Sequence, residues 1–269
     1  MKLSKTVLML LYAALIIIPV LTILLSTFKP MSEMYSNVLG LPEAFQLDNY
    51  VDVFMNQSMG TYFKNSLTVT LVSVILTLFF ASLIAFSIVR MGGWAGGLLF
   101  SFFAIGMMVP AQTNMIPLYQ LMYDWGLTNS LIGLMIVNIA VTMPVGVFIL
   151  TGFMKSLPKT IFEAAIMDGA GNWQMYSRIV LPLSLPSLSA TAIFLFVMHW
   201  NDLLYPLLFI TQDEFKTLPL ALLEFQGEYM TNYPLLFTGV IIASAPMVII
   251  YVFLQKYFIA GMTAGAVKG

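Results

Sequence analysis

Residues 153–185 read FMKSLPKTIFEAAIMDGAGNWQMYSRIVLPLSL. This charged segment joins two long stretches without a charged side chain, one between Asp124 and Lys155 and the other between Arg178 and Asp202. A bilayer core about 30 Å thick needs roughly 20 apolar residues in a helix, and each stretch is long enough. The segment is therefore expected to be a loop between two membrane-spanning helices.

The distances between successive charges predict six spans over the whole chain. Hydrophobic residues make up 60% of the 269 residues and charged residues 9%, whereas soluble domains are about half apolar and a quarter charged. Backbone amides cannot stay unpaired in lipid, so the spans are expected to be helices of an all-α membrane protein. We place them at residues 6–27, 66–89, 98–119, 130–152, 186–210 and 236–257 of a single transmembrane domain, residues 1–269.

The first span, residues 6–27, also raises the question of a signal peptide. Its apolar run is longer than the apolar region of a signal peptide, and no small-residue cleavage site follows it. We expect it to be retained as a membrane helix.

The positions of Lys and Arg predict the orientation, because short cytoplasmic loops carry an excess of these residues. If the chain crosses six times, eight basic residues fall on one side: Lys2, Lys5, Arg90, Lys155, Lys159, Arg178, Lys256 and Lys268. Only Lys29, Lys64 and Lys216 fall on the other side. Both termini and the loop at 153–185 are therefore expected to be cytoplasmic.

The loop itself has the pattern of a helix-turn-helix. Thr160 followed by Glu163 is typical of a capping box, in which each side chain bonds the backbone amide of the other residue. Gly169 and Gly171 supply conformations that end a helix, and Asn172 is expected to cap a second helix.

Two interpretations of the first loop helix follow from these residues. Ala164 and Ala165 would let another surface approach closely, while Glu163 and Asp168 would offer charges at its rim. Alternatively, Glu163 only caps the helix and the alanines only favour it, since Ala has the highest helix propensity.

Four motifs resemble those of a known family. Glu163-Ala164-Ala165, Gly169 six residues after the Glu, and then Ile179, Leu181 and Pro182 resemble the EAA motif of bacterial ABC importer permeases. Three stretches resemble the carbohydrate branch of that family, the maltose-type importers: Tyr62-Phe63-Lys64-Asn65-Ser66, Trp200-Asn201-Asp202 and the tail Gly261–Gly269. The resemblance covers essentially the whole chain.

This resemblance implies a type I ABC importer permease fold in a bacterial cell (inner) membrane, with a cytoplasmic coupling helix between helices 4 and 5. The permease would form half of the translocation path for a sugar or related solute. Its implied partners are two cytoplasmic ABC ATPase subunits, a second permease subunit and an extracytoplasmic solute-binding protein. The ATPase subunits would bind ATP and Mg, and this chain would bind no cofactor.

The resemblance also implies which residues meet the ATPase. In the loop these are Glu163, Ala164, Ala165, Asp168, Gly169, Ile179, Leu181 and Pro182. The tail is a second implied contact, through Gly261, Gly265 and Lys268. Against the tail contact stands the tendency of Gly-rich chain ends to fray.

Polar residues within the expected spans are candidates for the path: Asn114, Asn138, Trp200, Asn201, Asp202 and Tyr205. An ionisable group at membrane depth is costly unless it faces protein or water, so Asp202 either lines the path or stabilises the structure near the interface. Trp200 and Tyr205 would pack on a sugar ring or anchor the chain at the interface. Asn114 and Asn138 would face the path or bond neighbouring helices.

Composition and missing motifs exclude several other functions. The chain has no Cys and a single His, His199, so sites that need thiolates or two imidazoles are excluded. It has no G-x-x-x-x-G-K-[ST], GxSxG or HExxH motif, which favours a transporter subunit without its own ATPase over an enzyme. Its 11 basic residues are spread out and the net charge is −1, which argues against a nucleic-acid partner.

Three alternatives remain open at this point. One is a secondary transporter, which usually carries paired charges within the membrane. Another is an ABC permease for a non-sugar solute. The third is a membrane-embedded enzyme, which would need a cluster of titratable groups at one depth; for the paired charges of a secondary transporter, only Asp202 approaches the pattern.

Overall fold

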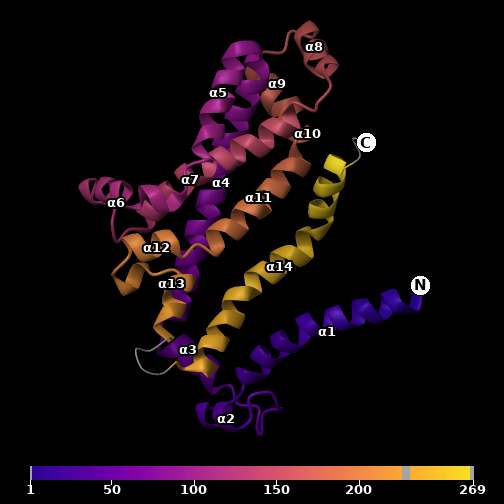
Figure 1. Cartoon of the computed structure of the whole chain (residues 1–269). Helices are drawn as coiled ribbons and strands as arrows, with labels where there is room; N and C mark the ends of the chain where they lie inside the picture. The colour runs from indigo at the N-terminus through magenta and orange to yellow at the C-terminus, as the bar shows by residue number, and fades with distance from the viewer. Residues whose placement is uncertain (1, 226–230, 267–269) are drawn as a thin grey trace. The chain divides into compact units, whose positions relative to one another are not determined.

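The computed structural model describes residues 2–225 and 231–266 and is built from helices (Figure 1). The chain divides into two compact units. Unit 1 comprises residues 1–64 and 216–247, and unit 2 comprises residues 65–215 and 248–269.

Four continuous helices are long and apolar enough to cross a membrane. They are α1 (Lys2–Ser26), α4 (Met59–Met91), α7 (Leu131–Met154) and α14 (Tyr233–Ala266). Two further candidates are pairs of helices bent at a break, so the described part of the chain provides up to six spans if each bent pair counts as one. The all-α membrane fold expected from the sequence is confirmed.

The third expected span, 98–119, is not one helix. α5 (Gly93–Gly106) meets the segment Ala111–Asp124, formed by η1 (Ala111–Asn114) and α6 (Met115–Asp124), at 83°. Pro110, before this second segment, has extended backbone angles. Proline has no N–H and disfavours a helical conformation in the residue before it, so the prediction of a continuous helix was wrong.

The fifth expected span, 186–210, is also interrupted. α11 (Leu185–Trp200) ends ten residues before the predicted boundary, and α12 (Leu204–Phe209) follows after a break. Asp202 Oδ1 accepts hydrogen bonds from the backbone N–H groups of Leu204 at 3.1 Å and Tyr205 at 3.5 Å. The carboxylate therefore caps a new helix, and the continuous helix predicted here was wrong as well.

Short helical elements connect the longer ones. In chain order they are α2 (Met31–Ser36), α3 (Asp48–Met55), α8 (Lys159–Met167), α9 (Asn172–Met175), the π-helical turn η2 (Tyr176–Val180), α10 (Leu181–Leu183), η3 (Asp213–Phe215), α13 (Leu218–Leu222) and η4 (Leu223–Phe225). The segment Asn172–Leu183 meets α11 at 73°.

In unit 1, the segment after α1 folds around a buried lysine. The Lys29 side chain is fully buried, and its Nζ donates to the backbone carbonyls of Asn37, Val38 and Gly40, at 2.7 Å for Gly40. Asn49 Nδ2 donates to the carbonyls of Thr27 and Lys29, at 2.9 Å each. A buried ammonium needs such acceptors, so Lys29 holds the turn after α2 in place.

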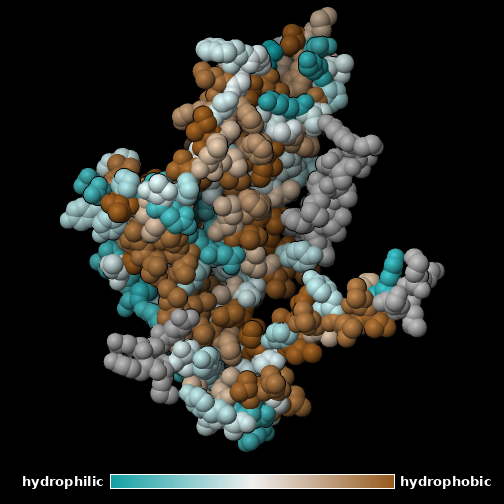
Figure 2. All heavy atoms as spheres, in the orientation of Figure 1, coloured by the Kyte–Doolittle hydropathy of each residue, from teal (hydrophilic) through white to brown (hydrophobic). Residues whose placement is uncertain are grey.

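In unit 2, α7 packs against both α5 and α11 (Figure 1). α7 also approaches α4 closely, because a Cβ at Gly146 would lie 3.0 Å from Ala81 Cβ. At the loop end of these helices a buried cluster joins α4 and α7 to the loop: Ala81, Ala85, Phe86, Ile88, Val147, Leu150, Met154, Ala165, Met175, Tyr176 and Val180. Figure 2 shows hydrophobic residues over the sides of the long helices, and hydrophilic residues gathered near α8.

Replacing Lys29 tests its role in unit 1. Lys29→Met removes the donor to three backbone carbonyls, and we expect a loss of stability of about 1–3 kcal/mol. Limited proteolysis of the purified protein should show faster cleavage within residues 30–47. An unchanged cleavage rate would contradict a structural role for Lys29.

Candidate functional site

The first loop helix, α8, begins differently from the prediction. Its N-cap is Pro158, without a side-chain capping bond. Thr160 and Glu163 therefore lie inside the helix, and the predicted capping box is wrong. The exposed Glu163 carboxylate forms no hydrogen bond or ion pair with any residue that the structure describes.

α8 ends as predicted at Gly169, whose φ of 74° is left-handed. The Gly169 and Ala170 N–H groups donate to the carbonyls of Ile166 and Ala165, both at 2.9 Å, which is the Schellman pattern. The next helix, α9, begins at Asn172 with Gly171 as its N-cap, so Asn172 is not the cap that we predicted. The Asn172 Oδ1 instead accepts from Arg90 Nε at 3.2 Å.

The two alanines of α8 differ in burial. Ala165 is 4% exposed and belongs to the buried cluster that joins α4 and α7. Ala164 is exposed, as are Glu163, Asp168 and Gly169. One side of α8 is therefore packed against the membrane helices, and the other side is exposed, with Glu163 at the edge of a cleft that Arg90 and Lys155 also line.

The other residues of the motif divide in the same way. Ile179 and Leu181 are half-buried against the cluster, and Pro182 is exposed. Sequence reasoning missed the most exposed apolar side chains of this loop, Met167 at 86% and Trp173 at 64%. Their occurrence in a charged loop is the signal that would have identified them.

Unit 2 also contains a cleft of about 770 Å³ between the bent pair α5–α6, α7 and the end of α11. Its polar lining residues come from all three regions: Asn114, Asn138, Thr142, His199, Asp202 and Tyr205. The lining includes four of the six path candidates. Of the other two, Trp200 is buried and stacks on Phe196, and Asn201 is exposed with its Nδ2 bonded to the Val197 carbonyl at 2.8 Å.

Some polar atoms of the cleft are paired within the chain. Thr142 Oγ1 donates to the Asn138 carbonyl at 2.6 Å and lies 3.3 Å from His199 Nε2. Two side-chain oxygens are buried without a partner among the described residues, Oδ1 of Asn114 and Oδ2 of Asp202. Asp202 thus has one oxygen that caps α12 and a second that has no donor. Capping of α12 therefore explains the position of Oδ1 but not that of Oδ2.

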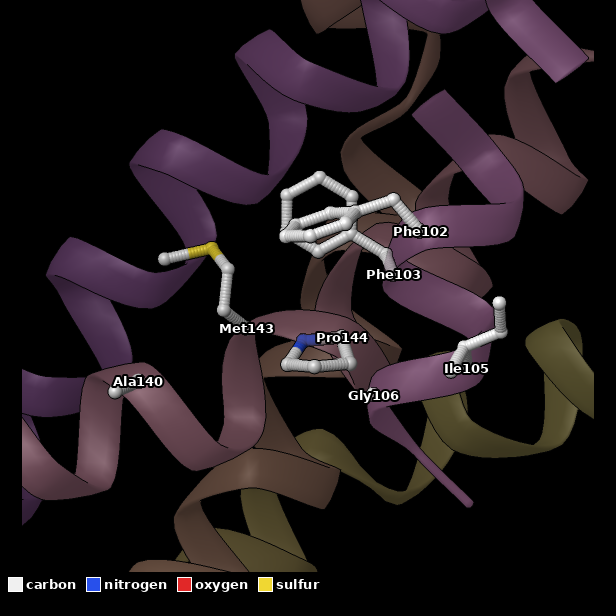
Figure 3. A pocket seen from close by; sticks show the side chains of 7 residues that line it. All are labelled: Phe102, Phe103, Ile105, Gly106, Ala140, Met143 and Pro144. Carbon is white, nitrogen blue, oxygen red and sulfur yellow. The ribbon is translucent and has the colours of Figure 1, made fainter. Parts of the chain in front are cut away.

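A second cleft, of about 490 Å³, lies beside the first and is almost wholly apolar. Figure 3 shows that its side chains come from two helices, α5 and α7: Phe102, Phe103, Ile105, Gly106, Ala140, Met143 and Pro144. Gly106, Ala140 and Pro144 line both clefts. The polar and the apolar cleft are therefore neighbours on the same pair of helices.

The structure does not describe the side chains of the tail, so it does not test the predicted tail contact. Gly261 and Gly265 are within α14, and Lys268 lies outside the described residues.

Comparison with known proteins identifies the family. Residues 73–264 match the family described as the binding-protein-dependent transport system inner membrane component. The chain belongs to this family. It is a multi-pass membrane protein and a permease subunit of an ABC importer, and the family consists of transport proteins rather than enzymes.

Curated relatives match the permease over nearly its whole length. The arabinooligosaccharides transport system permease protein AraQ of Halalkalibacterium halodurans is 33% identical over 261 residues, with 96% of this chain and 93% of the relative covered. The melibiose/raffinose/stachyose import permease protein MelC of Bacillus subtilis is 34% identical over 248 residues, with 92% and 90% covered.

A solved structure has the same fold as this permease. It is a chain of a bacterial ABC transporter involved in the import of the acidic polysaccharide alginate, with a TM-score of 0.85 and 20% sequence identity. The match covers 96% of both chains. The ABC importer permease fold expected from the sequence is confirmed.

The two alanines of α8 provide a matched pair of variants. Ala165→Leu adds volume to a packed cluster and should lower stability by about 1–3 kcal/mol. Ala164→Leu adds the same volume on an exposed surface and should leave stability unchanged. Thermal unfolding of the purified variants measures both effects. Equal destabilisation by the two substitutions would contradict the assignment of Ala165 to the buried side of α8 and Ala164 to its exposed side.

Proposed function

We propose that this permease forms half of the translocation path of a carbohydrate importer in a bacterial inner membrane. Its relatives support this substrate class, since their names specify arabinooligosaccharides, melibiose, raffinose, stachyose and multiple sugars. Both termini would be cytoplasmic, as the distribution of Lys and Arg favours.

The partners of the proposed importer are a second permease subunit, two ATPase subunits and an extracytoplasmic solute-binding protein. A structural relative at 15% identity was solved in a complex with an alginate pentasaccharide-bound periplasmic protein. That likeness concerns the fold alone, so the binding protein of this importer is part of the proposal. ATP and Mg would be bound by the ATPase subunits.

The observation that carries the proposal is the two-sided geometry of α8. Its exposed side offers Glu163, Ala164 and Asp168 to a partner, while Ala165 seats the helix on the cluster of α4 and α7. A partner that pushes on the exposed side would transmit force to the membrane helices through packed side chains, because packed interiors compress little. We propose that the ATPase subunit is this partner.

A connection from the π-helical turn η2, later in the same loop, to the membrane helix α4 supports the same mechanism. The Tyr176 hydroxyl lies 2.8 Å from Ser82 Oγ, and its ring packs on Phe86 at 5.5 Å between centroids. Residues of α4 are therefore bonded directly to the turn that follows α9. Closure of the ATPase pair would move this assembly as a unit, and the path would alternate between its outward and inward openings. The tail residues Gly261, Gly265 and Lys268 would provide a second contact.

Glu163→Gln tests the coupling contact. The substitution removes a charge that forms no described bond within the chain, so folding and insertion should be unchanged. We expect association with the ATPase subunit to weaken about tenfold, because a hydrogen bond to a charged group is worth about 1.5–3 kcal/mol and Gln keeps part of it. Co-purification of the ATPase and solute uptake by vesicles measure the effect.

Glu214→Gln is the matched control. Glu214 is an exposed acid in η3, on the side that the charge distribution places outside. The control should leave both ATPase binding and uptake unchanged. Full ATPase binding and full uptake by Glu163→Gln would refute the proposed role of Glu163.

A further inference from the structure

The cleft of 770 Å³ lies where two expected spans break. The break between α5 and α6 contributes Met107, Val109 and Ala111 to its lining, and the break after α11 contributes Asp202. Non-helical backbone at membrane depth is tolerated only where protein buries it or where it lines a water-filled cavity. Two breaks that face one cleft are what a water-filled cavity would permit.

The unpaired atoms of the cleft are hydrogen-bond acceptors. Asn114 Oδ1 and Asp202 Oδ2 are buried without a donor among the described residues. Buried polar atoms normally have partners, and each exception needs an explanation such as a water or a ligand. A solute rich in hydroxyl groups would supply the missing donors.

The charges of the cleft favour one class of solute over another. Its titratable lining residues are His199, Asp202 and Tyr205, and the described lining contains no Lys or Arg. An anion in this cleft would meet a carboxylate and no opposing cation. Aromatic and apolar side chains, among them Trp125 and Met198, complete the walls and suit the apolar faces of sugar rings.

We propose that this cleft is a solute subsite of the translocation path that accepts neutral, hydroxyl-rich rings and disfavours anionic ones. Asp202 is its specificity-determining residue, and Asn114 is the second acceptor. This inference rests on the proposed function of the chain as half of a carbohydrate path, and it assigns a charge preference to that path.

Cysteine labelling tests the hydration and the charge of the cleft without knowledge of the natural solute. The chain contains no Cys, so Met198→Cys creates a unique target on the cleft wall, where Met198 is 41% exposed. The assembled transporter in membrane vesicles is treated with a cationic methanethiosulfonate, MTSET, or an anionic one, MTSES. The mass shift of this chain is followed, and each rate is divided by the rate of the same reagent with a free thiol.

We expect the normalised rate of MTSET to exceed that of MTSES by about tenfold, because a cleft of one charge sign with low-dielectric walls concentrates counter-ions. Asp202→Asn in the Met198→Cys background should bring the ratio close to one. Asn keeps an oxygen that can cap α12, so the fold should be retained. Asp124→Asn, an exposed acid at the end of α6 that does not line the cleft, should leave the ratio unchanged.

Two further single-cysteine variants show whether the labelling ratio depends on the choice of Met198. Asn114→Cys should show the same preference for the cation, whereas Phe102→Cys, in the apolar cleft of Figure 3, should react slowly with both reagents. Equal rates at Met198→Cys and Asn114→Cys, a preference for MTSES, or no reaction at either position would overturn the inference. Uptake of raffinose by the unsubstituted transporter is measured separately, so failure of the proposed function is distinguished from failure of the subsite.

Discussion

The close contact between α4 and α7 supports the rest of unit 2. A Cβ at Gly146 would lie only 3.0 Å from Ala81 Cβ, and small residues at such crossings let two membrane helices approach within van der Waals distance. The buried cluster continues from this crossing to Ala165 and Tyr176 in the loop. The loop is therefore an extension of the membrane helices, and a force on α8 would reach α4 and α7 without passing through a flexible connection.

Of these two helices, α7 also forms one wall of the polar cleft. α7 contributes Asn138 and Thr142 to that wall, and the interrupted spans contribute Asn114 and Asp202. Helix breaks cost backbone hydrogen bonds, and in this chain Asp202 compensates for one of them by capping α12. The proposed coupling contact and the proposed path thus share α7: its loop end packs on α8, and its middle lines the cleft.

The sequence predicted the fold to a large extent, because lipid permits few structures and the distances between charges locate the spans. It did not locate the breaks, since Pro110 and Asp202 act through backbone geometry that a hydropathy pattern does not contain. The motif Glu163-Ala164-Ala165 identified the loop, but only the structure separates Ala164 from Ala165, because their burial depends on α4 and α7. The capping box was predicted from Thr160 and Glu163, yet Pro158 precedes them and starts the helix earlier.

The proposed contact between the exposed side of α8 and the ATPase subunit can be tested by cross-linking. Ala164→Cys places a single thiol on that side, and a short thiol-to-amine cross-linker in native membranes would join it to any partner within reach. We predict a covalent product of this chain with the ATPase subunit from Ala164→Cys, and none from Met55→Cys, where Met55 of α3 is 80% exposed. Absence of the ATPase product from Ala164→Cys in the assembled transporter, or an equal yield from Met55→Cys, would contradict the proposed contact between α8 and the ATPase subunit.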